Sequence, residues 1–231
     1  MMLQTCVILA GGLGSRLSGV LAGRPKCLAP IGSRTFLELQ IESLASRGID
    51  RFVLSLGHQA DQVLAVTEIL QARFTIDPVV EPSRLGTGGG VLFTLDHCAL
   101  EEALVVNGDT WLDGPLDAMF EPLRGSEQLR MAAVAVPDRG RFGGLELQGA
   151  KVVGFVEKGS NTPGLINAGL YRVHRRAFEG WHMKSAFSLE ADVMPHLMDF
   201  AGLTAITIDG SFIDIGVPED YYRFCNEHAL A

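Results

Sequence analysis

The chain has 231 residues, 47% of them hydrophobic and 20% charged, and its formal net charge is −8 at pH 7. That length predicts one domain with a substantial core, and the acidic balance argues against nucleic-acid binding, which needs a clustered basic face. No apolar stretch approaches the roughly 18 residues of a membrane span, so we expect neither a nucleic acid nor a membrane as a partner.

The cysteines and the amino terminus bear on the compartment. The four cysteines are scattered along the chain and include no C-x-x-C pair, which argues against a disulfide framework or a zinc site and suits a reducing environment. The first residues lack a basic segment, and their short apolar run is interrupted by glycines, unlike a signal peptide. We therefore expect a cytoplasmic protein.

Strand and helix patterns alternate through the first half of the chain, which predicts an α/β fold. We expect a three-layer α/β/α sandwich around a mixed, mostly parallel sheet. The apolar run at residues 6–10 has the length and β-branched content of a buried strand. Further strands are expected over residues 51–56, 74–80 and 103–106. One helix is expected from about Leu37 to near Gly48, a second around the apolar face of Val63, Val66 and Leu70, and a third over about residues 91–98.

The second half is less regular. Tyr171 is expected to be a packing residue, and a closing helix is expected to begin at Pro218. We find no repeat and no linker, so residues 1–231 are predicted to form a single domain. The strands expected here cover residues 129–136, 143–147, 151–156, 167–173, 203–208 and 212–214.

A glycine-rich loop over residues 11–17 follows the first predicted strand. Glycines let backbone N–H groups approach a polyphosphate closely, and Arg16 and Lys26 add positive charge nearby. A dinucleotide fingerprint would need glycine where Leu17 stands, and the P-loop string is absent. The pattern therefore predicts a phosphate site at the carboxyl end of the first strand, the alternative being a turn that only needs positive φ.

Further motifs follow this loop along the chain. They are Glu81-Pro82, Leu85-Gly86-Thr87-Gly88-Gly89, Gly108-Asp109, Gly143, Glu157-Lys158, Asn167-Ala168-Gly169 and Asp214 within residues 212–221. In this order, and together with the loop, they resemble the sugar-1-phosphate nucleotidyltransferases, which join a sugar 1-phosphate to a nucleoside triphosphate. The resemblance covers nearly the whole chain and implies the Rossmann-like nucleotide-diphospho-sugar transferase fold, with a nucleotide-binding half over about residues 1–110 and a sugar-binding half over about 111–231.

The resemblance assigns residues to each substrate. The implied sugar-phosphate residues are Gly143, Glu157, Lys158, Asn167 and Gly169. Glu190 follows Ser188, a predicted helix N-cap, and is interpreted as a first-turn helix charge, with a place in the sugar pocket as the alternative. The implied nucleotide-binding residues are Leu9, Ala10, Gly11, Gly12, Gly14, Ser15, Arg16, Lys26, Glu81, Gly86, Thr87, Asn107 and Gly108.

Asp109 and Asp214 each end a predicted strand, and the resemblance implies that they bind Mg²⁺ together. One such aspartate is ordinarily a cap or turn residue, but two in matching contexts favour a metal site. In the implied reaction a sugar phosphate oxygen attacks the α-phosphorus and pyrophosphate leaves. Because both substrates are anions, the protein mainly neutralises charge and fixes geometry, and Arg16, Lys26 and Asp109 are the predicted catalytic residues.

Glu81 bears on the nucleotide base. Guanine presents a ring N–H beside an exocyclic NH₂, two donors that suit a carboxylate acceptor. Family members that use uridine or thymidine nucleotides commonly carry Gln at the matching place. Glu81 therefore favours GTP, the alternative being a glutamate that merely precedes Pro82 at the exit of a strand.

The compact length narrows the resemblance. With its L-G-T-G-G and D-I-G-V-P-E-D-Y strings, the chain most resembles the D-glycero-D-manno-heptose 1-phosphate guanylyltransferases. This implies transfer of GMP from GTP to that heptose 1-phosphate, giving GDP-heptose and pyrophosphate for capsule, lipopolysaccharide or S-layer glycan synthesis, in a homodimer. Cys27 departs from the usual Pro or Ala, and the triplet Gly88-Gly89-Gly90 also occurs in relatives that act on amino sugars.

Three alternatives remain open. The first is the same type of transferase with another nucleotide and sugar, such as UTP with an amino-sugar 1-phosphate. The second is a nucleotide-sugar-dependent glycosyltransferase, which has no need of the glycine loop with Arg16 and Lys26. The third is a regulatory subunit that binds nucleotide sugar without turnover, against which the presence of Asp109 and Asp214 argues.

Overall fold

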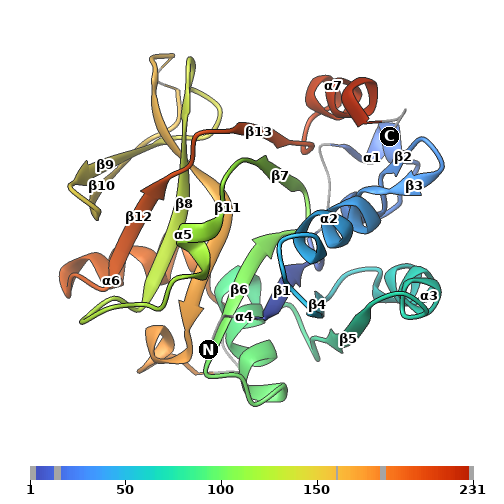
Figure 1. Cartoon of the computed structure of the whole chain (residues 1–231), viewed down its shortest axis with the longest axis horizontal. Coiled ribbons are helices and arrows are strands. Elements are labelled where there is room, and N and C mark those ends of the chain that lie inside the picture. Colours follow the sequence, from blue (N-terminus) through green and yellow to red (C-terminus); the bar gives the residue numbers. More distant parts are fainter. Residues whose placement is uncertain (1–3, 13–16, 160, 183–185, 229–231) are drawn as a thin grey trace. The chain divides into compact units, whose positions relative to one another are not determined.

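A computed structural model describes residues 4–12, 17–159, 161–182 and 186–228 (Figure 1). The chain packs into two compact units that alternate along the sequence. The β1 unit comprises Gln4–Arg84, Val106–Trp111 and Ile213–Ala231, and the β8 unit comprises Met1–Leu3, Leu85–Val105 and Leu112–Phe212. Three strands have residues in both units, namely β6 (Glu102–Asn107), β7 (Thr110–Asp113) and β13 (Ser211–Asp214).

Three parallel strands form the centre of the β1 unit. Strand β4 (Arg51–Leu56) pairs with β1 (Thr5–Leu9) on one side and with β5 (Thr75–Val80) on the other. Cys6, Val7 and Ile8 are completely buried, as expected for a parallel strand covered on both faces. Helix α2 (Phe36–Ala45) lies between β1 and β4 in the sequence, and α3 (Ala60–Leu70) lies between β4 and β5, which is the order of a βαβ arrangement.

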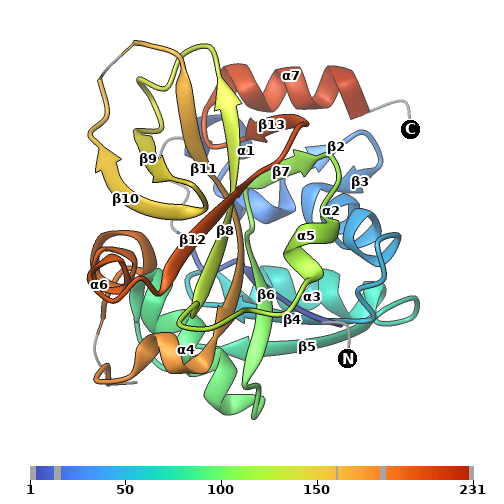
Figure 2. The same cartoon turned by 60° about the vertical axis from the view of Figure 1, so that its left-hand side comes forward.

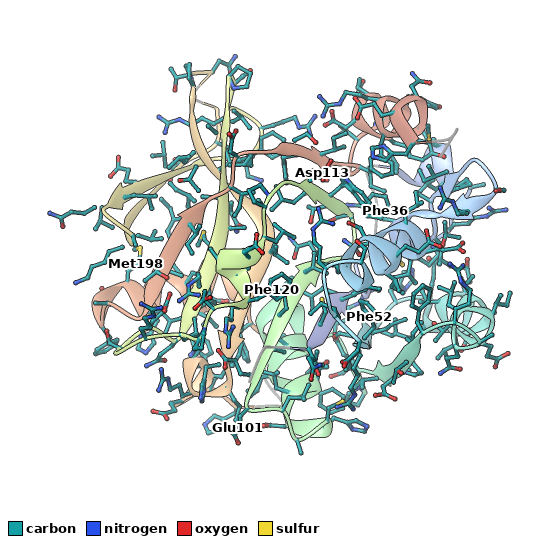
Figure 3. The ribbon with its side chains drawn as sticks, in the orientation of Figure 1. Phe36, Phe52, Glu101, Asp113, Phe120 and Met198 are labelled. Carbon is teal, nitrogen blue, oxygen red and sulfur yellow. The ribbon has the colours of Figure 1, made fainter. Side chains whose placement is uncertain are left out.

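The closing helix α7 (Pro218–His228) packs against the N-terminal part of the same unit. Figures 1 and 2 show it beside the hairpin of β2 (Pro30–Ile31) and β3 (Arg34–Thr35). The Tyr221 hydroxyl donates a 2.8 Å hydrogen bond to the Pro30 carbonyl. The ring of Phe224 lies 5.0 Å from that of Phe36. Phe36, with Phe52 of β4, is among the largest fully buried side chains (Figure 3).

The β8 unit has mixed pairing. Strand β8 (Leu129–Val136) is antiparallel to β11 (Gly164–His174) and parallel to β12 (Leu203–Thr207). β12 adjoins β10 (Lys151–Val156), which forms an antiparallel hairpin with β9 (Gly144–Gln148) (Figure 2). Further helical segments among the described residues are α1 (Ser18–Leu21), Lys26–Leu28, α4 (Gly86–His97), α5 (Asp117–Phe120), Arg175–Phe178, Leu189–Val193 and α6 (Met194–Asp199).

These observations confirm the predicted α/β class and mixed sheet. In the β1 unit, β4 pairs in parallel with both β1 and β5. In the β8 unit the pairs described above are antiparallel except for β8 with β12. The single domain, with its nucleotide-binding and sugar-binding halves, stays a prediction. Within the described ranges, no helix combines the length and apolar character needed to cross a membrane.

The predicted helix over residues 91–98 is wrong at its start, because α4 begins at Gly86. Its first turn has no side-chain cap; instead the N–H groups of Gly88 and Gly89 donate to the Phe187 carbonyl at 3.0 and 3.3 Å. A Cβ at Gly86 would overlap that same carbonyl oxygen. The glycines therefore belong to a helix that is pressed against residues 187–189, and local helix propensity could not indicate this.

Gly88→Ala is expected to destabilise the protein. A Cβ at position 88 would lie 2.5 Å from Cδ2 of buried Phe187 and 3.0 Å from the Leu189 nitrogen. Overpacking of this kind costs about 1–3 kcal/mol, more than the about 1 kcal/mol that alanine contributes in a helix. Chemical denaturation measures the change. Gly19→Ala in α1, where a Cβ meets no atom within 4 Å, is the matched control, and equal midpoints for the two variants would contradict the packing argument.

Candidate active site

The ends of β1, β4 and β6 meet through backbone contacts in the β1 unit. The N–H of Gly108 donates to the Leu9 carbonyl at 3.0 Å, and the N–H of Ala10 donates to the Ser55 carbonyl at 2.9 Å. A Cβ at Gly108 would lie 2.6 Å from the Leu9 oxygen, and one at Gly11 would lie 3.0 Å from the Gly57 nitrogen. Glycine at these positions is what allows the strand ends to come so close.

Lys26 and Asp109 form an ion pair beside these strand ends. Lys26 opens the helical turn Lys26–Leu28, and its Nζ lies 2.7 Å from Oδ2 of Asp109. The two side chains are 17% and 27% exposed, so a ligand can still reach them while bulk water screens them only in part. The pair joins residues that are 83 positions apart in the sequence.

Asp214 is brought to the same place. The N–H of Ile215 donates to the Asp109 carbonyl at 2.9 Å, and the N–H of Gly216 donates to Oδ1 of Asp214 at 2.7 Å. A Cβ at Gly216 would lie 2.7 Å from that Oδ1 and 3.3 Å from Nζ of Lys26. Oδ1 of Asp214 and Nζ of Lys26 thus both lie beside Gly216, and Lys26 in turn pairs with Asp109, so that two carboxylates and one ammonium group gather in one region.

The chemistry of this donor set fits a hard divalent cation. Mg²⁺ is commonly held by one or two carboxylates together with substrate phosphate oxygens, and it does not require a complete cage of protein ligands. In the described part of the chain, no cluster of three or more His, Cys, Asp or Glu side chains could hold a metal. A cation at Asp109 and Asp214 would thus depend on a phosphate ligand for the rest of its coordination.

The Glu81 carboxylate lies at the same end of the parallel strands. Its backbone N–H donates to the Leu56 carbonyl at 2.8 Å. Ser55 donates from Oγ to Oε1 of Glu81 at 3.4 Å, and Oε2 lies 3.8 Å from where a Cβ on Gly57 would stand. Because Gly57 touches Gly11, the carboxylate is next to the start of the glycine-rich loop. Gly12 is also described, whereas Gly14, Ser15 and Arg16 lie outside the described residues.

The β8 unit brings together a second set of predicted residues. Gly143 has φ of +78°, and a Cβ there would lie 2.8 Å from the Val156 carbonyl oxygen and 3.7 Å from Cγ of Lys158. The β9–β10 hairpin thus places Gly143 against the base of the exposed Lys158 and next to Glu157. Gly86, Thr87, Asn167 and Gly169 belong to the same unit.

Sequence reasoning missed the contacts of Glu190. Thr87 donates to its carboxylate from 103 positions away, and no local pattern indicates such a pairing. Ser188 is confirmed as an N-cap, since its hydroxyl accepts from the Ala191 N–H at 3.0 Å, and Tyr171 is confirmed as a packing residue, with no exposed surface. Asn107 has a structural contact as well: its backbone carbonyl accepts a 3.0 Å hydrogen bond from the side-chain amide of buried Gln40.

The nucleotidyl transferase family model matches residues 5–229. The chain belongs to the nucleotidyl transferase family. This confirms the family resemblance and the enzyme class predicted from the motifs. Members of this family generally use a divalent metal.

Individual relatives match over almost their whole length. The D-glycero-alpha-D-manno-heptose 1-phosphate guanylyltransferase of Aneurinibacillus thermoaerophilus is 32% identical, with 94% of this chain and 95% of the relative covered. The enzyme of the same name from Campylobacter jejuni is also 32% identical, with 94% and 97% covered. The crystal structure of HddC from Yersinia pseudotuberculosis complexed with GMP-PN is 33% identical, covers 97% of this chain and 99% of its own, and has a TM-score of 0.83. That likeness confirms the predicted Rossmann-like fold.

The thiol of Cys27, next to Lys26, is expected to resist modification. Burial, together with the negative charge of Asp109, raises the pKa of Cys27 to about 12, and burial also raises the pKa of Cys6. At pH 8 both thiols should stay protonated and unreactive, whereas Cys98 and Cys225 are partly exposed. Mass spectrometry after treatment with a thiol reagent should find label only on Cys98 and Cys225, until denaturant is added. Rapid labelling of Cys27 in the folded protein would show that its surroundings are open.

Proposed function

We propose that this protein transfers GMP from GTP to D-glycero-D-manno-heptose 1-phosphate, giving GDP-heptose and pyrophosphate for capsule, lipopolysaccharide or S-layer glycan synthesis. The observation that carries the proposal is the similarity to two heptose 1-phosphate guanylyltransferases over 94% of this chain, with little of either relative left unmatched. The substrates of this reaction are a nucleotide and a sugar phosphate. The homodimer and the cytoplasmic location expected from the sequence are part of the proposal.

The β1 unit would bind the nucleotide. Gly12 leaves room for phosphates near the end of β1, because no atom lies within 4 Å of where its Cβ would stand, whereas the space beside Gly11 is taken by Gly57. Glu81 would accept hydrogen bonds from the ring N–H and the amino group of guanine. Support for this role of Glu81 comes from its position beside the contact between Gly11 and Gly57. The crystal structure of HddC contains GMP-PN, which is consistent with a guanine nucleotide.

The reaction replaces one phosphorus–oxygen bond by another. A phosphate oxygen of the sugar 1-phosphate forms a bond to the α-phosphorus of GTP, and the bond from that phosphorus to the bridging oxygen breaks, so that pyrophosphate leaves with the electron pair. Lys26 would donate to a non-bridging oxygen of the α-phosphate, and its ion pair with Asp109 fixes the position of its Nζ. Arg16 would stabilise the charge that develops on the departing pyrophosphate.

Asp109 and Asp214 are the residues that would hold Mg²⁺. When bound, this ion would neutralise charge on the phosphate oxygens. The β8 unit would bind the sugar phosphate, with Lys158 on the phosphate and Glu157 and Asn167 on hydroxyl groups. Support for this assignment comes from the close approach of Gly143 to Lys158, which places two of the predicted sugar-phosphate residues side by side.

A substrate matrix tests the proposed function. The purified protein is incubated with each of the four nucleoside triphosphates against D-glycero-D-manno-heptose, mannose and N-acetylglucosamine 1-phosphates, and pyrophosphate release is measured. GTP with the heptose phosphate should give the highest kcat/KM, and EDTA should abolish turnover until Mg²⁺ is added. A preference for UTP with the amino-sugar phosphate would overturn the proposed base and sugar, and an absence of turnover with every pair would favour a regulatory subunit.

Glu81→Gln examines the base preference within the same matrix. Because a hydrogen bond to a charged group contributes about 1.5–3 kcal/mol, the variant should raise the KM for GTP by about tenfold or more and leave the KM for UTP nearly unchanged. Glu68→Gln, at an exposed position of α3, is the matched control. A Glu81→Gln variant with normal preference for GTP would remove the guanine-reading role.

Asp109→Asn is expected to lower kcat by about 10²–10³-fold, the effect of losing one preorganised electrostatic partner. Since the ion pair with Lys26 is partly exposed, the free energy of unfolding should change by only about 1 kcal/mol. Asp77→Asn serves as the control. Asp77 also pairs with a cation, Arg51 at 2.8 Å, but it lies within strand β5 and away from Asp109 and Lys26. Near-normal turnover of Asp109→Asn with saturating Mg²⁺ would contradict the metal site.

A further inference from the structure

Both oxygens of the Glu190 carboxylate accept hydrogen bonds within the β8 unit. Thr87 donates to Oε2 at 2.8 Å, and Ser188 donates to the same oxygen at 3.1 Å. The hydroxyl of Tyr171 donates to Oε1 at 3.4 Å. Glu190 thus touches the start of α4 through Thr87 and the strand β11 through Tyr171.

A chain of two hydrogen bonds leads from Glu190 through Tyr171 to Asn167, and the acceptor character of Glu190 determines which group donates in each of them. A carboxylate can only accept, so the hydroxyl hydrogen of Tyr171 points to Glu190 and the Tyr171 oxygen is left to accept. It accepts from Nδ2 of Asn167 at 2.9 Å. At the other end of the same amide, Oδ1 of Asn167 accepts from the N–H of Gly169 at 2.9 Å.

Only one orientation of the Asn167 amide satisfies both neighbours. If the amide were flipped, its NH₂ would face the N–H of Gly169, and its oxygen would face a hydroxyl oxygen whose hydrogen is already used by Glu190. Two hydrogen bonds would be lost and two repulsive contacts would replace them. The direction of the amide is therefore set from both ends, by the N–H of Gly169 and, through Tyr171, by Glu190, although Glu190 does not touch Asn167.

A bulge in β11 makes this arrangement possible. Asn167 pairs with Ala133, but Tyr171 already pairs with Met131, so the register shifts between them. In a regular strand, residues four apart are separated by about 13 Å. The bulge, with Gly169 at φ of +68°, folds the strand so that the two side chains come within hydrogen-bonding distance and both can be directed to one place.

Tyr171 has no exposed surface, so it cannot touch a substrate itself. Asn167 is partly exposed, and among the described residues nothing accepts its second Nδ2–H. This second N–H of the Asn167 amide is therefore available to donate a hydrogen bond to a ligand.

We propose that Glu190 and Tyr171 are positioning residues that orient Asn167 as a hydrogen-bond donor to the sugar 1-phosphate. The inference rests on the proposed function in so far as Asn167 binds the sugar. It adds that the sugar must present an oxygen lone pair at that point, a hydroxyl or ether oxygen, and that an ammonium substituent there would meet a donor instead of an acceptor.

Two substitutions remove the polarity and keep the volume. Tyr171→Phe deletes the hydroxyl and leaves the buried ring. Glu190→Gln replaces one acceptor oxygen by an NH₂ group, so that either Tyr171 or the pair Thr87 and Ser188 faces a donor where the carboxylate offered an acceptor. Each change removes one of the two constraints on the Asn167 amide and leaves only the Gly169 N–H to orient it. Because Tyr171 is completely buried, Tyr171→Phe removes no group that can contact the sugar.

The test measures KM for each substrate and kcat for both variants, for the double variant and for Tyr222→Phe, a matched control at an exposed position of α7 in the β1 unit. We expect each single variant to raise the KM of the sugar 1-phosphate about tenfold, the size of one neutral hydrogen bond. The kcat and the KM of the nucleotide should stay within about twofold. The double variant should be no worse than either single variant, because both break the same chain.

An unchanged sugar KM in folded Tyr171→Phe would overturn the inference, as would additive effects in the double variant. A fall in kcat and a rise in both KM values, in step with a lower melting temperature, would assign the network to stability alone. If Tyr171→Phe does not fold, Glu190→Gln decides, because its charge change lies on a partly exposed side chain.

The proposed function and the inference fail in different ways. A wild-type preference for another nucleotide and sugar overturns the proposed function, and the KM comparison is then made on the preferred pair. If the wild type turns over no pair, calorimetric titration with D-glycero-D-manno-heptose 1-phosphate replaces the kinetics. A dissociation constant that Tyr171→Phe raises about tenfold supports the orienting role, and an equal or unmeasurable affinity in both proteins overturns it.

Discussion

The Leu9 carbonyl accepts a hydrogen bond from the N–H of Gly108, and a Cβ at position 108 would lie 2.6 Å from that oxygen. This close approach of two strand ends sets the starting point of Asp109, the next residue. The Asp109 carbonyl then receives the N–H of Ile215 at 2.9 Å, and its carboxylate receives Lys26 at 2.7 Å. Backbone groups at the strand ends need partners, which brings the segments of Leu9, Asp109 and Ile215 together, and the ion pair adds Lys26 to them.

Charge explains why this meeting point suits the transfer of a nucleotide. Asp109 and Asp214 together outweigh the single positive charge of Lys26, so by themselves they would repel phosphates. A divalent cation held by the two aspartates, as proposed, would reverse the balance and leave a net positive site for anionic substrates. This matches the general use of a divalent metal in the family, and it gives the ion pair a purpose: Lys26 is held in place before the substrate arrives.

Much of the fold could be predicted because its elements carry strong local patterns. The strand over residues 129–136 was expected at its observed bounds, Leu129–Val136, since its uninterrupted apolar run has one obvious structure. The prediction fails where packing overrides local preference. Helix α4 begins among glycines because Phe187 occupies the space that larger side chains would need. The hairpin at residues 30–35 has strands of only two residues each, which is too short to show an alternation of apolar and polar residues in the sequence.

For the site, the sequence by itself determined which chemical groups are available: a glycine loop, cations, two strand-end aspartates and an asparagine, in the order typical of one family. Only the tertiary structure decided which of these groups touch. Thr87 meets Glu190 from 103 residues away, and the bulge of β11 turns Tyr171 toward Asn167. Hydrogen bonds depend on direction and distance in space, and neither can be calculated from the spacing of residues along a chain.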